Sequence, residues 1–457
     1  MVNQEEQVSF YGEIIRIQSE PTKARKGDYR FSGVELTGDL PGSRTFIIFP
    51  EFSGEDFFLF PQLCWLGARL SARNLSLNNS LDDGSMIFCV NPESELVLEP
   101  FRPVSVIEAI DSFKCIKSID LRYRLKSGEP YWLAKGKAIH TMFDQLVRNP
   151  IEDLETLFDR SFTPVVREFV QTLPGSSTWV TYSDFRQELR RHYKNLATWL
   201  SNNLPRPHGV DTEQDRLSVR YGLKGRTDAV FYSDSGATIV EVKSGKFISD
   251  EHLMQLYAYD LMIREDDGLA GIDSHVVYSS TGLSRTVDEL GNNLTRSILH
   301  GRNVSVALKR FYAFGDNLCD TQLFSQCEIG KRCHSRANCD EFYGSDMVFG
   351  KVLSPVQKKY YDSWFGLICI DEWYQESEFA NILDKSTLNE RLKEGITIPV
   401  DRVTVDSNPK NQISGRRSVN TPKSADPFTD MPFSEDEKPH SLGPVSVTVE
   451  SAHGFGD

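Results

Sequence analysis

Short stretches in which apolar and polar residues alternate fill the first hundred residues of the chain. QVSFYGEIIRI, YRFSGVEL, RTFIIF and ELVLEP are among them, and Gly, Pro, Asn and Asp turns separate one from the next. A period of two places successive side chains on opposite faces of a strand, so each stretch predicts a half-buried β-strand. Many short strands in succession are typical of a small barrel or sandwich, and we predict an OB-like β-barrel over residues 1–100.

From about residue 104 the apolar positions recur at helical spacing instead. In AKGKAIHTMFDQLVRN one apolar stripe is formed by Ile139, Met142, Phe143 and Leu146. Such a stripe predicts a helix with one buried face, and His140 lies beside it. Further along we expect a helix over 180–203, then two or three strands that include a pair over about 217–243, and then a helix in SDEHLMQLYAYDLMIRED. Strands enclosed by helices predict an α/β domain over 101–350.

The last hundred residues fall into two parts. Helical periodicity returns in SPVQKKYYDSWFGLICIDEWYQESEFANIL, which predicts a helical stalk over 351–403. After it the chain becomes polar and rich in Pro, Ser and Asp, a composition that does not bury enough apolar surface to order itself. We therefore expect a flexible acidic tail or linker over 404–457.

Composition limits the class of protein. The formal net charge is −14 over 457 residues, which speaks against a uniformly basic nucleic-acid-binding surface. Electrostatic steering depends on local charge, however, so a local basic patch remains compatible with this total. The first twenty residues lack the pattern of a signal peptide, and no run of about 18 apolar residues occurs. These features predict a soluble, cytoplasmic protein that does not bind a membrane.

A local basic patch is present just before His140. Candidate DNA-binding residues in it are Lys114, Lys117, Arg122, Arg124, Lys135 and Lys137, and Arg186 and Arg190 extend it on the helix over 180–203. Charge of this kind binds phosphate without reading base sequence. A solvated helix face is the alternative interpretation of the residues on that helix.

Eight cysteines divide into two groups by their surroundings. Three of them, Cys64, Cys89 and Cys369, stand in apolar runs and are interpreted as core thiols. The other five lie in polar segments: Cys115 stands alone in SFKCIKS, and Cys319, Cys327, Cys333 and Cys339 crowd into one short stretch. In a reducing compartment such cysteines are more often ligands than disulfides.

The run IVEVKSGK carries the strongest chemical signal. It reads as a buried strand, yet Glu241 and Lys243 are two residues apart and so point to the same face. Asp228 precedes Glu241 by thirteen residues, at the end of another predicted strand. Two carboxylates bind Mg²⁺ or Mn²⁺ through oxygen, and a lysine beside them offsets charge on a phosphate, so the set suits metal-assisted phosphodiester hydrolysis. An ordinary ion pair is the alternative for Glu241 and Lys243.

These motifs, in this order, resemble those of a known enzyme family. GRTDAVF, then IVEVKSGK, then QLYAY resembles the RecB-like branch of the PD-(D/E)XK nuclease superfamily, and GKAIH matches its upstream Gly-x-x-x-His element. The resemblance implies a restriction-endonuclease-like core, a mixed sheet flanked by helices. It implies that His140, Asp228 and Glu241 are metal ligands and that Lys243 is the catalytic lysine. Gln255 and Tyr259 would join the catalytic site from a helix.

An iron-sulfur branch of this family holds a [4Fe-4S] cluster with one cysteine before the nuclease core and three after it. The resemblance implies that Cys115, Cys333 and Cys339 are ligands. The usual Cys-x-x-Cys is absent, because Gly330 stands three residues before Cys333, so the fourth ligand is Cys327 or else Cys319. Four thiolates also suit Zn²⁺, which is the alternative to the cluster.

Within that branch, residues 95–345 resemble most the nuclease half of the nuclease-helicase family that trims flaps and resects DNA ends. LVLEPFRPVSVIEAIDSFKC and YGLKGRTDAVF carry this likeness. No G-x-x-x-x-G-K-[ST] motif occurs in the sequence, so we expect any unwinding to come from a separate helicase.

Together these features predict a metal-dependent nuclease of single-stranded or flap DNA that acts in DNA repair, replication or defence. The alternative is a non-catalytic module on a nuclease fold, one that binds single-stranded nucleic acid or recruits a helicase. Retention of Asp228, Glu241 and Lys243 together argues against a decayed site.

Overall fold

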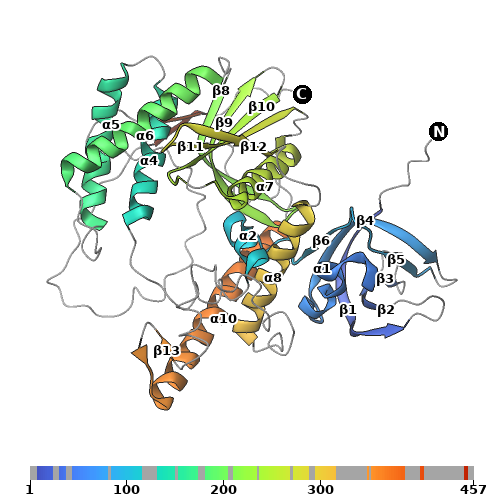
Figure 1. Cartoon of the computed structure of the whole chain (residues 1–457). Helices are drawn as coiled ribbons and strands as arrows, with labels where there is room; N and C mark the ends of the chain where they lie inside the picture. The colour runs from blue at the N-terminus through green and yellow to red at the C-terminus, as the bar shows by residue number, and fades with distance from the viewer. Residues whose placement is uncertain are drawn as a thin grey trace, which may run out of the picture. The chain divides into compact units, whose positions relative to one another are not determined.

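The structure is a computed structural model, drawn in Figure 1. It describes residues 8–23, 30–37, 44–80, 84–115, 131–149, 153–172, 181–203, 209–233, 236–246, 248–267, 271–287, 294–314, 347–348, 351–385, 402–405 and 447–450. The chain divides into two compact units, residues 1–377 and residues 378–457.

A six-stranded sheet forms the N-terminal part of the first unit. Its strands are β1 (Val8–Lys23), β2 (Arg30–Thr37), β3 (Arg44–Pro50), β4 (Arg69–Ser80), β5 (Met86–Cys89) and β6 (Glu95–Leu98). Hydrogen-bonded neighbours run in the order β1-β2-β3-β5-β4-β6, and β1 also pairs with β4. All of these pairings are antiparallel except that of β3 with β5. The alternating stretches thus form strands as expected, and the OB-like barrel stays a prediction.

Between β3 and β4 the chain makes three short helical turns. They are η1 (Glu51–Ser53), α1 (Glu55–Phe58) and η2 (Phe60–Leu63). Phe60 and Leu63 of η2 are buried with Ile14, Leu36 and Ile47 of the sheet, which together form much of the core of this region. The inward side chains of the strands therefore close over one apolar layer.

A second, mixed sheet follows with helices on both sides. Its strands are β7 (Val104–Ser105), β8 (Gly209–Ser218), β9 (Leu223–Ser233), β10 (Gly236–Lys243), β11 (Ile272–Tyr278) and β12 (Leu283–Thr286). The order is β12-β11-β10-β9-β7, and β8 pairs with β9. The helices are α2 (Val106–Lys114), α4 (Tyr131–Arg148), α5 (Leu154–Thr172), α6 (Tyr182–Asn203), α7 (Asp250–Asp267) and α8 (Leu294–Phe314). This mixed α/β arrangement is consistent with a PD-(D/E)XK-like core.

Strand β10 is buried on both faces. Val240 and Val242 belong to the apolar core formed with α4, α5 and α6, which Figure 1 shows together beside the sheet. Ile239 points the other way and packs with Leu253 and Leu256 of α7. Burial on two sides explains the nearly continuous apolar run in the sequence, and it makes the charged pair at the end of this strand energetically costly.

The strand pair expected over 217–243 proves to be three strands, because β8 precedes it. Its sequence, GVDTEQDRLS, has polar residues at most positions and lacks alternating apolar residues. Local periodicity therefore gave no sign of β8. The helix expected over 180–203 is α6, which begins at Tyr182 and ends at Asn203.

Helix α8 ties the two sheets together through two polar side chains. The Asn303 amide accepts a hydrogen bond from the Leu98 N–H (2.9 Å) and donates one to the Leu96 carbonyl (2.7 Å), both in β6. Arg302 is fully buried, and its guanidinium donates to the carbonyl oxygens of Leu98, Glu99, Arg102 and Gly222. Gly222 directly precedes β9, so one side chain binds backbone next to both sheets.

The remaining described elements lie toward the C-terminus. They are β13 (Met347–Val348), β14 (Lys351–Val352), α10 (Pro355–Lys385), β15 (Arg402–Val405) and β16 (Val447–Glu450). The last two pair with each other antiparallel. The expected domain boundaries, including the stalk and the tail, stay predictions. Among the described residues, none of the helices combines the length and apolar character needed to cross a membrane.

Candidate active site

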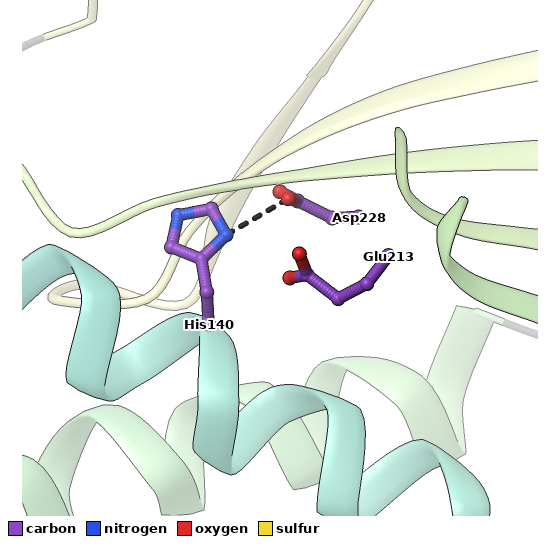
Figure 2. A group of neighbouring side chains, drawn as sticks. All are labelled: His140, Glu213 and Asp228. Carbon is purple, nitrogen blue, oxygen red and sulfur yellow. Dashed lines mark hydrogen bonds and ion pairs between the residues drawn. The ribbon is translucent and has the colours of Figure 1, made fainter. Parts of the chain in front are cut away.

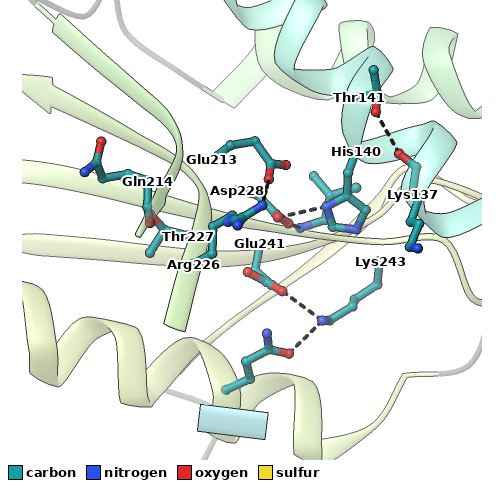
Figure 3. A network of polar contacts seen from close by, with 12 residues as sticks. Lys137, His140, Thr141, Glu213, Gln214, Arg226, Thr227, Asp228, Glu241 and Lys243 are labelled. Atoms are coloured by element: carbon teal, nitrogen blue, oxygen red, sulfur yellow. Dashed lines mark hydrogen bonds and ion pairs between the residues drawn. The ribbon is translucent and has the colours of Figure 1, made fainter. Parts of the chain in front are cut away.

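The site forms where β9 and β10 separate. Their ladder of paired residues ends at Val240 with Ala229. Beyond that pair, the side chain of Asp228 replaces the backbone as hydrogen-bond partner: its Oδ2 accepts from the Val242 N–H at 2.6 Å. Figure 3 shows the resulting network. A carboxylate in place of a ladder partner is held rigidly, and Asp228 is only 6% exposed.

His140 reaches Asp228 from helix α4. Its Nδ1 lies 2.8 Å from Asp228 Oδ1. Burial opposes the charged imidazolium, but the charge of Asp228 and the hydrogen bond to it outweigh burial and raise the pKa of His140 to about 9. In the absence of a cation the two side chains therefore form an ion pair, with Nδ1–H donating to the carboxylate.

Glu213 completes this group, and sequence analysis missed it. It lies in β8 between Thr212 and Gln214, whose partners on β9 flank Asp228. One oxygen or nitrogen atom from each of Glu213, Asp228 and His140 lies within 4.8 Å of the other two. Figure 2 shows the three side chains pointing toward one another. Burial and the neighbouring Asp228 raise the pKa of Glu213. The only sequence signal was an acidic residue in a strand that periodicity did not reveal.

A chain of polar contacts runs from β10 to helix α7. Lys243 Nζ donates to Glu241 Oε1 at 2.8 Å and to Gln255 Oε1 at 2.7 Å. The amide of Gln255 in turn donates to the Tyr259 hydroxyl at 3.2 Å. The structure thus brings together the four residues that the sequence grouped by motif order, and it places them next to Asp228.

Glu241 carries a buried oxygen that lacks a hydrogen-bond partner among the described residues, Oε2. Burial first, and then the charge of Asp228, raise the pKa of Glu241 to about 7, against the opposing effect of Lys243. Buried polar atoms are normally satisfied, and adjacent carboxylates repel each other. A divalent cation would relieve both effects, so these residues fit a Mg²⁺ or Mn²⁺ site.

Gly225 explains why the GRTD motif and the Gln-x-x-x-Tyr helix occur together. A Cβ atom at this position would lie 2.6 Å from the Tyr259 ring carbon Cε1, far inside van der Waals contact. Only glycine lets the ring approach β9 this closely, so Gly225 fixes the distance between α7 and the strand that carries Asp228.

The backbone of Lys243 is tethered to β11 and α6. Its carbonyl accepts hydrogen bonds from the Ser279 N–H (2.9 Å) and hydroxyl (3.0 Å). His192, 2% exposed, lies with Nδ1 2.8 Å from the same hydroxyl. Burial lowers the pKa of His192 to about 4, so the imidazole is neutral at pH 7. Neither His192 nor Ser279 was expected from the sequence.

Several candidate DNA-binding residues are paired with carboxylates. Lys135 lies 3.0 Å from Glu188, while Arg186 and Arg190 bind carboxylates of α5. Lys137 is exposed on α4. The side chain of Lys114 is not described, and Lys117, Arg122 and Arg124 lie outside the described residues. A DNA-binding role for this set stays a prediction.

The cysteine cluster falls mostly outside the described part of the chain. Cys115 is described: it is half-buried at the end of α2, and its N–H donates to the Asp111 carbonyl at 2.9 Å. The other expected ligands, Cys327, Cys333 and Cys339, lie outside the described residues, as does Cys319. Cys369 is buried in a core cluster, Cys64 is half-buried and packs against the core of the N-terminal sheet, and Cys89 is half-buried.

Comparison with known proteins supports a class for this region. Residues 114–305 match the model of the PD-(D/E)XK nuclease superfamily. This range contains the residues from His140 to Tyr259 described above, and the match supports the superfamily and suggests nuclease activity. Members of the superfamily are generally metal-dependent nucleases that act on DNA, which agrees with a His, Glu and Asp group able to hold a metal ion. No curated protein sequence matches the chain.

Two solved structures show local likeness. One is the solution structure of a replication factor A related protein from Methanobacterium thermoautotrophicum, with 13% identity, coverage of 21% of this chain and 84% of that chain, and a TM-score of 0.17. The other is the crystal structure of SSO0001, with 12% identity, coverage of 44% and 84%, and a TM-score of 0.19. At these scores the two likenesses do not establish a common fold.

Proposed function

We propose that the protein is a Mg²⁺- or Mn²⁺-dependent deoxyribonuclease that hydrolyses phosphodiester bonds. One observation carries the proposal: the group formed by buried Asp228 with half-buried His140 and Glu213 lies beside the Glu241 and Lys243 pair. Removing each of these charges from water costs free energy, which destabilises a strand that has only a structural role. A bound charged ligand would offset that cost.

Asp228, Glu241 and His140, with Glu213, are the residues that would hold the cation. When bound, Mg²⁺ or Mn²⁺ polarises the scissile phosphate and lowers the pKa of a coordinated water. The protein holds these ligands in place beforehand. The Val242 N–H orients Asp228, and Asp228 orients the imidazole of His140.

Lys243 acts as a charged donor in this proposal. Burial alone would lower its pKa, but the charge of Glu241 and the hydrogen bond to it outweigh burial and raise the pKa of Lys243. The ammonium group therefore keeps its protons at neutral pH and is poor as a general base. Held by Glu241 and Gln255, it would donate to a phosphoryl oxygen on which charge develops, or position the attacking water.

The substrate, partner and second cofactor are finer proposals. We propose single-stranded or flap DNA, with an OB-like N-terminal module that binds the strand; the pairing of β1 with both β2 and β4 supports that fold. Resemblance to the nuclease-helicase family supports a separate helicase partner and a role in repair, replication or defence. It also supports a [4Fe-4S] cluster, or Zn²⁺, held by Cys115, Cys333, Cys339 and either Cys327 or Cys319.

A cleavage assay tests the enzyme directly. End-labelled linear and circular single-stranded DNA are incubated with Mg²⁺, Mn²⁺ or EDTA and with wild type, Glu241→Ala or Lys243→Ala. We expect metal-dependent cutting that Glu241→Ala abolishes and that Lys243→Ala slows by on the order of 100-fold. The circle shows whether a free end is required.

The same samples distinguish the alternative. Tight DNA binding without cutting by any of the three proteins would favour a non-catalytic binding module. Equal cutting by wild type and both variants would remove these residues from the active site.

A further inference from the structure

Strands β8 and β9 carry four charged side chains on one face, beside the cation group. Asp215 pairs directly with Arg226 across the two strands. Residues two apart on an extended strand share a face, so Asp228 lies on the side of Arg226. Glu213 lies on the same side, because its Oε2 is 3.5 Å from Arg226 Nη1. Three of the four are carboxylates, and Arg226 is the one cation among them.

Arg226 lies between the buried group and solvent. Side-chain exposure rises from 8% at Asp228 through 30% at Glu213 and 42% at Arg226 to 75% at Asp215. Arg226 Nε donates to Asp215 Oδ1 at 2.9 Å, and Nη1 contacts Glu213 Oε2 at 3.5 Å. Figure 3 shows the guanidinium beside Glu213 and Asp228.

A guanidinium in this position reduces the repulsion between the carboxylates and the phosphates of a phosphodiester substrate. Without Arg226, this part of the approach to the cation group would present only carboxylates, which repel phosphate. A guanidinium has five N–H donors in a fixed fork. Its Nη2 makes no hydrogen bond to another described residue, so donors remain for a ligand while Asp215 holds Nε.

We propose that Arg226 binds a phosphate of the substrate strand adjacent to the cation group. This inference rests on the proposed nuclease function and adds a substrate-binding residue to it. It commits to a phosphodiester backbone as the ligand, because the fork matches phosphate oxygens and does not require a particular base.

Two substitutions separate phosphate binding from a structural role. Arg226→Ala and Asp215→Asn both break the same cross-strand pair. If the pair only stabilised the hairpin, the two variants would behave alike. If Arg226 binds phosphate, only Arg226→Ala weakens binding, since Asp215→Asn keeps the guanidinium and removes a competing carboxylate. Arg264→Ala is the matched control: Arg264 is 40% exposed, and its Nε likewise pairs with a carboxylate, at 2.7 Å, on α7.

The measurement is binding of a fluorescently labelled single-stranded oligonucleotide with Ca²⁺ in place of Mg²⁺, over roughly 50–200 mM salt. Arg226→Ala should weaken binding by about tenfold or more. It should also make the slope of log binding constant against log salt shallower by about 0.7, the loss of one phosphate contact on a single strand. Asp215→Asn and Arg264→Ala should bind at least as tightly as wild type. A Mn²⁺ titration should show cation binding by Arg226→Ala no weaker than by wild type, because a nearby positive charge is gone.

Other outcomes overturn the inference. Equal weakening by Arg226→Ala and Asp215→Asn assigns the pair to the hairpin, and an unchanged salt slope in Arg226→Ala excludes a phosphate contact. Cleavage by the wild type is measured in parallel. If the wild type cleaves and Arg226→Ala binds the oligonucleotide as tightly as the wild type, only this inference is rejected. A wild type that neither binds nor cleaves the strand rejects the proposed function as well.

Discussion

Glu213 has a left-handed backbone, with φ of 51°, in the middle of a strand. This conformation costs a residue other than glycine about 1–2 kcal/mol. The same residue directs its carboxylate toward His140 and Asp228. Strain at a residue in a buried charged group is a mark of function, because stability alone would favour glycine there.

Two substitutions at this position should therefore separate the effect of Glu213 on stability from its effect on activity. We expect the Glu213→Gly protein to be more stable than the Glu213→Val protein, with a free energy of unfolding higher by about 1–2 kcal/mol. The reason is that valine adopts a positive φ only at a cost in free energy. Both should cleave DNA more slowly than wild type, since both lack the carboxylate. Urea denaturation in EDTA and a cleavage assay measure the two effects. A glycine variant with wild-type activity would show that Glu213 is not part of the site.

Glu241 should make the cation-free protein less stable as pH rises. Its pKa is about 7 in the fold, against an ordinary value of 4.5. Between these values the folded state binds more protons than the unfolded state, so the free energy of unfolding falls as pH rises through the window. Glu241→Gln lacks this titration, and its advantage in melting temperature over wild type should grow from about pH 4.5 to about pH 7 in EDTA. Parallel curves for the two proteins would contradict the raised pKa.

At the scale of elements, sequence predicted those parts that a local pattern encodes. Helices α4 and α6 have clear helical periodicity, strand β10 is a nearly continuous apolar run, and motif order grouped His140, Asp228, Glu241 and Lys243. Strand β8 was not predicted, because its residues are mostly polar and the residue it contributes to the site has an unusual backbone conformation. The contacts of His192 and Ser279 near Lys243 were not predicted for another reason. They arise only from tertiary packing, which cannot be inferred from spacing along the chain.

Gly225 is the element-scale position most open to test. In Gly225→Ala the new methyl group would displace the Tyr259 ring and, through Gln255, the amide oxygen that accepts a hydrogen bond from Lys243. We expect a fall in cleavage rate of on the order of 10- to 100-fold, with Mn²⁺ binding retained. Gly209→Ala in β8 is the control, because a Cβ there meets nothing within 4 Å. If Gly225→Ala cleaved as fast as Gly209→Ala, the close approach of α7 would be irrelevant to the rate.

At the scale of the whole molecule, α8 joins regions that are far apart in sequence. Asn303 binds β6, more than two hundred residues earlier in the chain, and Arg302 binds backbone on both sides of the junction. Helix α8 was not predicted from the sequence. A buried arginine that satisfies carbonyl oxygens from distant segments depends on the finished fold, so it was not predictable from local pattern.

Arg302→Met should reveal how much this junction contributes to stability. The substitution removes the side-chain hydrogen bonds to four carbonyl oxygens. The Glu99 and Gly222 carbonyls still accept from the Arg102 and Val104 N–H groups, and each buried group that is left unsatisfied costs about 1–3 kcal/mol. We expect the free energy of unfolding to fall by on the order of 3 kcal/mol or more in urea denaturation. Arg148→Met, at a residue 56% exposed with one ion pair on its own helix, should stay within about 0.5 kcal/mol of wild type. Equal stability of the two variants would mean that the junction is not structural.

The protein is a nuclease only if the buried carboxylates drive cleavage. The most direct measurement is the single-turnover rate at which wild type and Asp228→Asn cut single-stranded DNA at saturating Mg²⁺, with DNA binding measured in the same samples. Asparagine keeps the size of the side chain and an oxygen for the Val242 N–H, but it removes the charge that would hold the cation. We predict a rate lower by at least about 100-fold with DNA binding retained. An Asp228→Asn protein that cuts at the wild-type rate would contradict the assignment of this site as the catalytic centre.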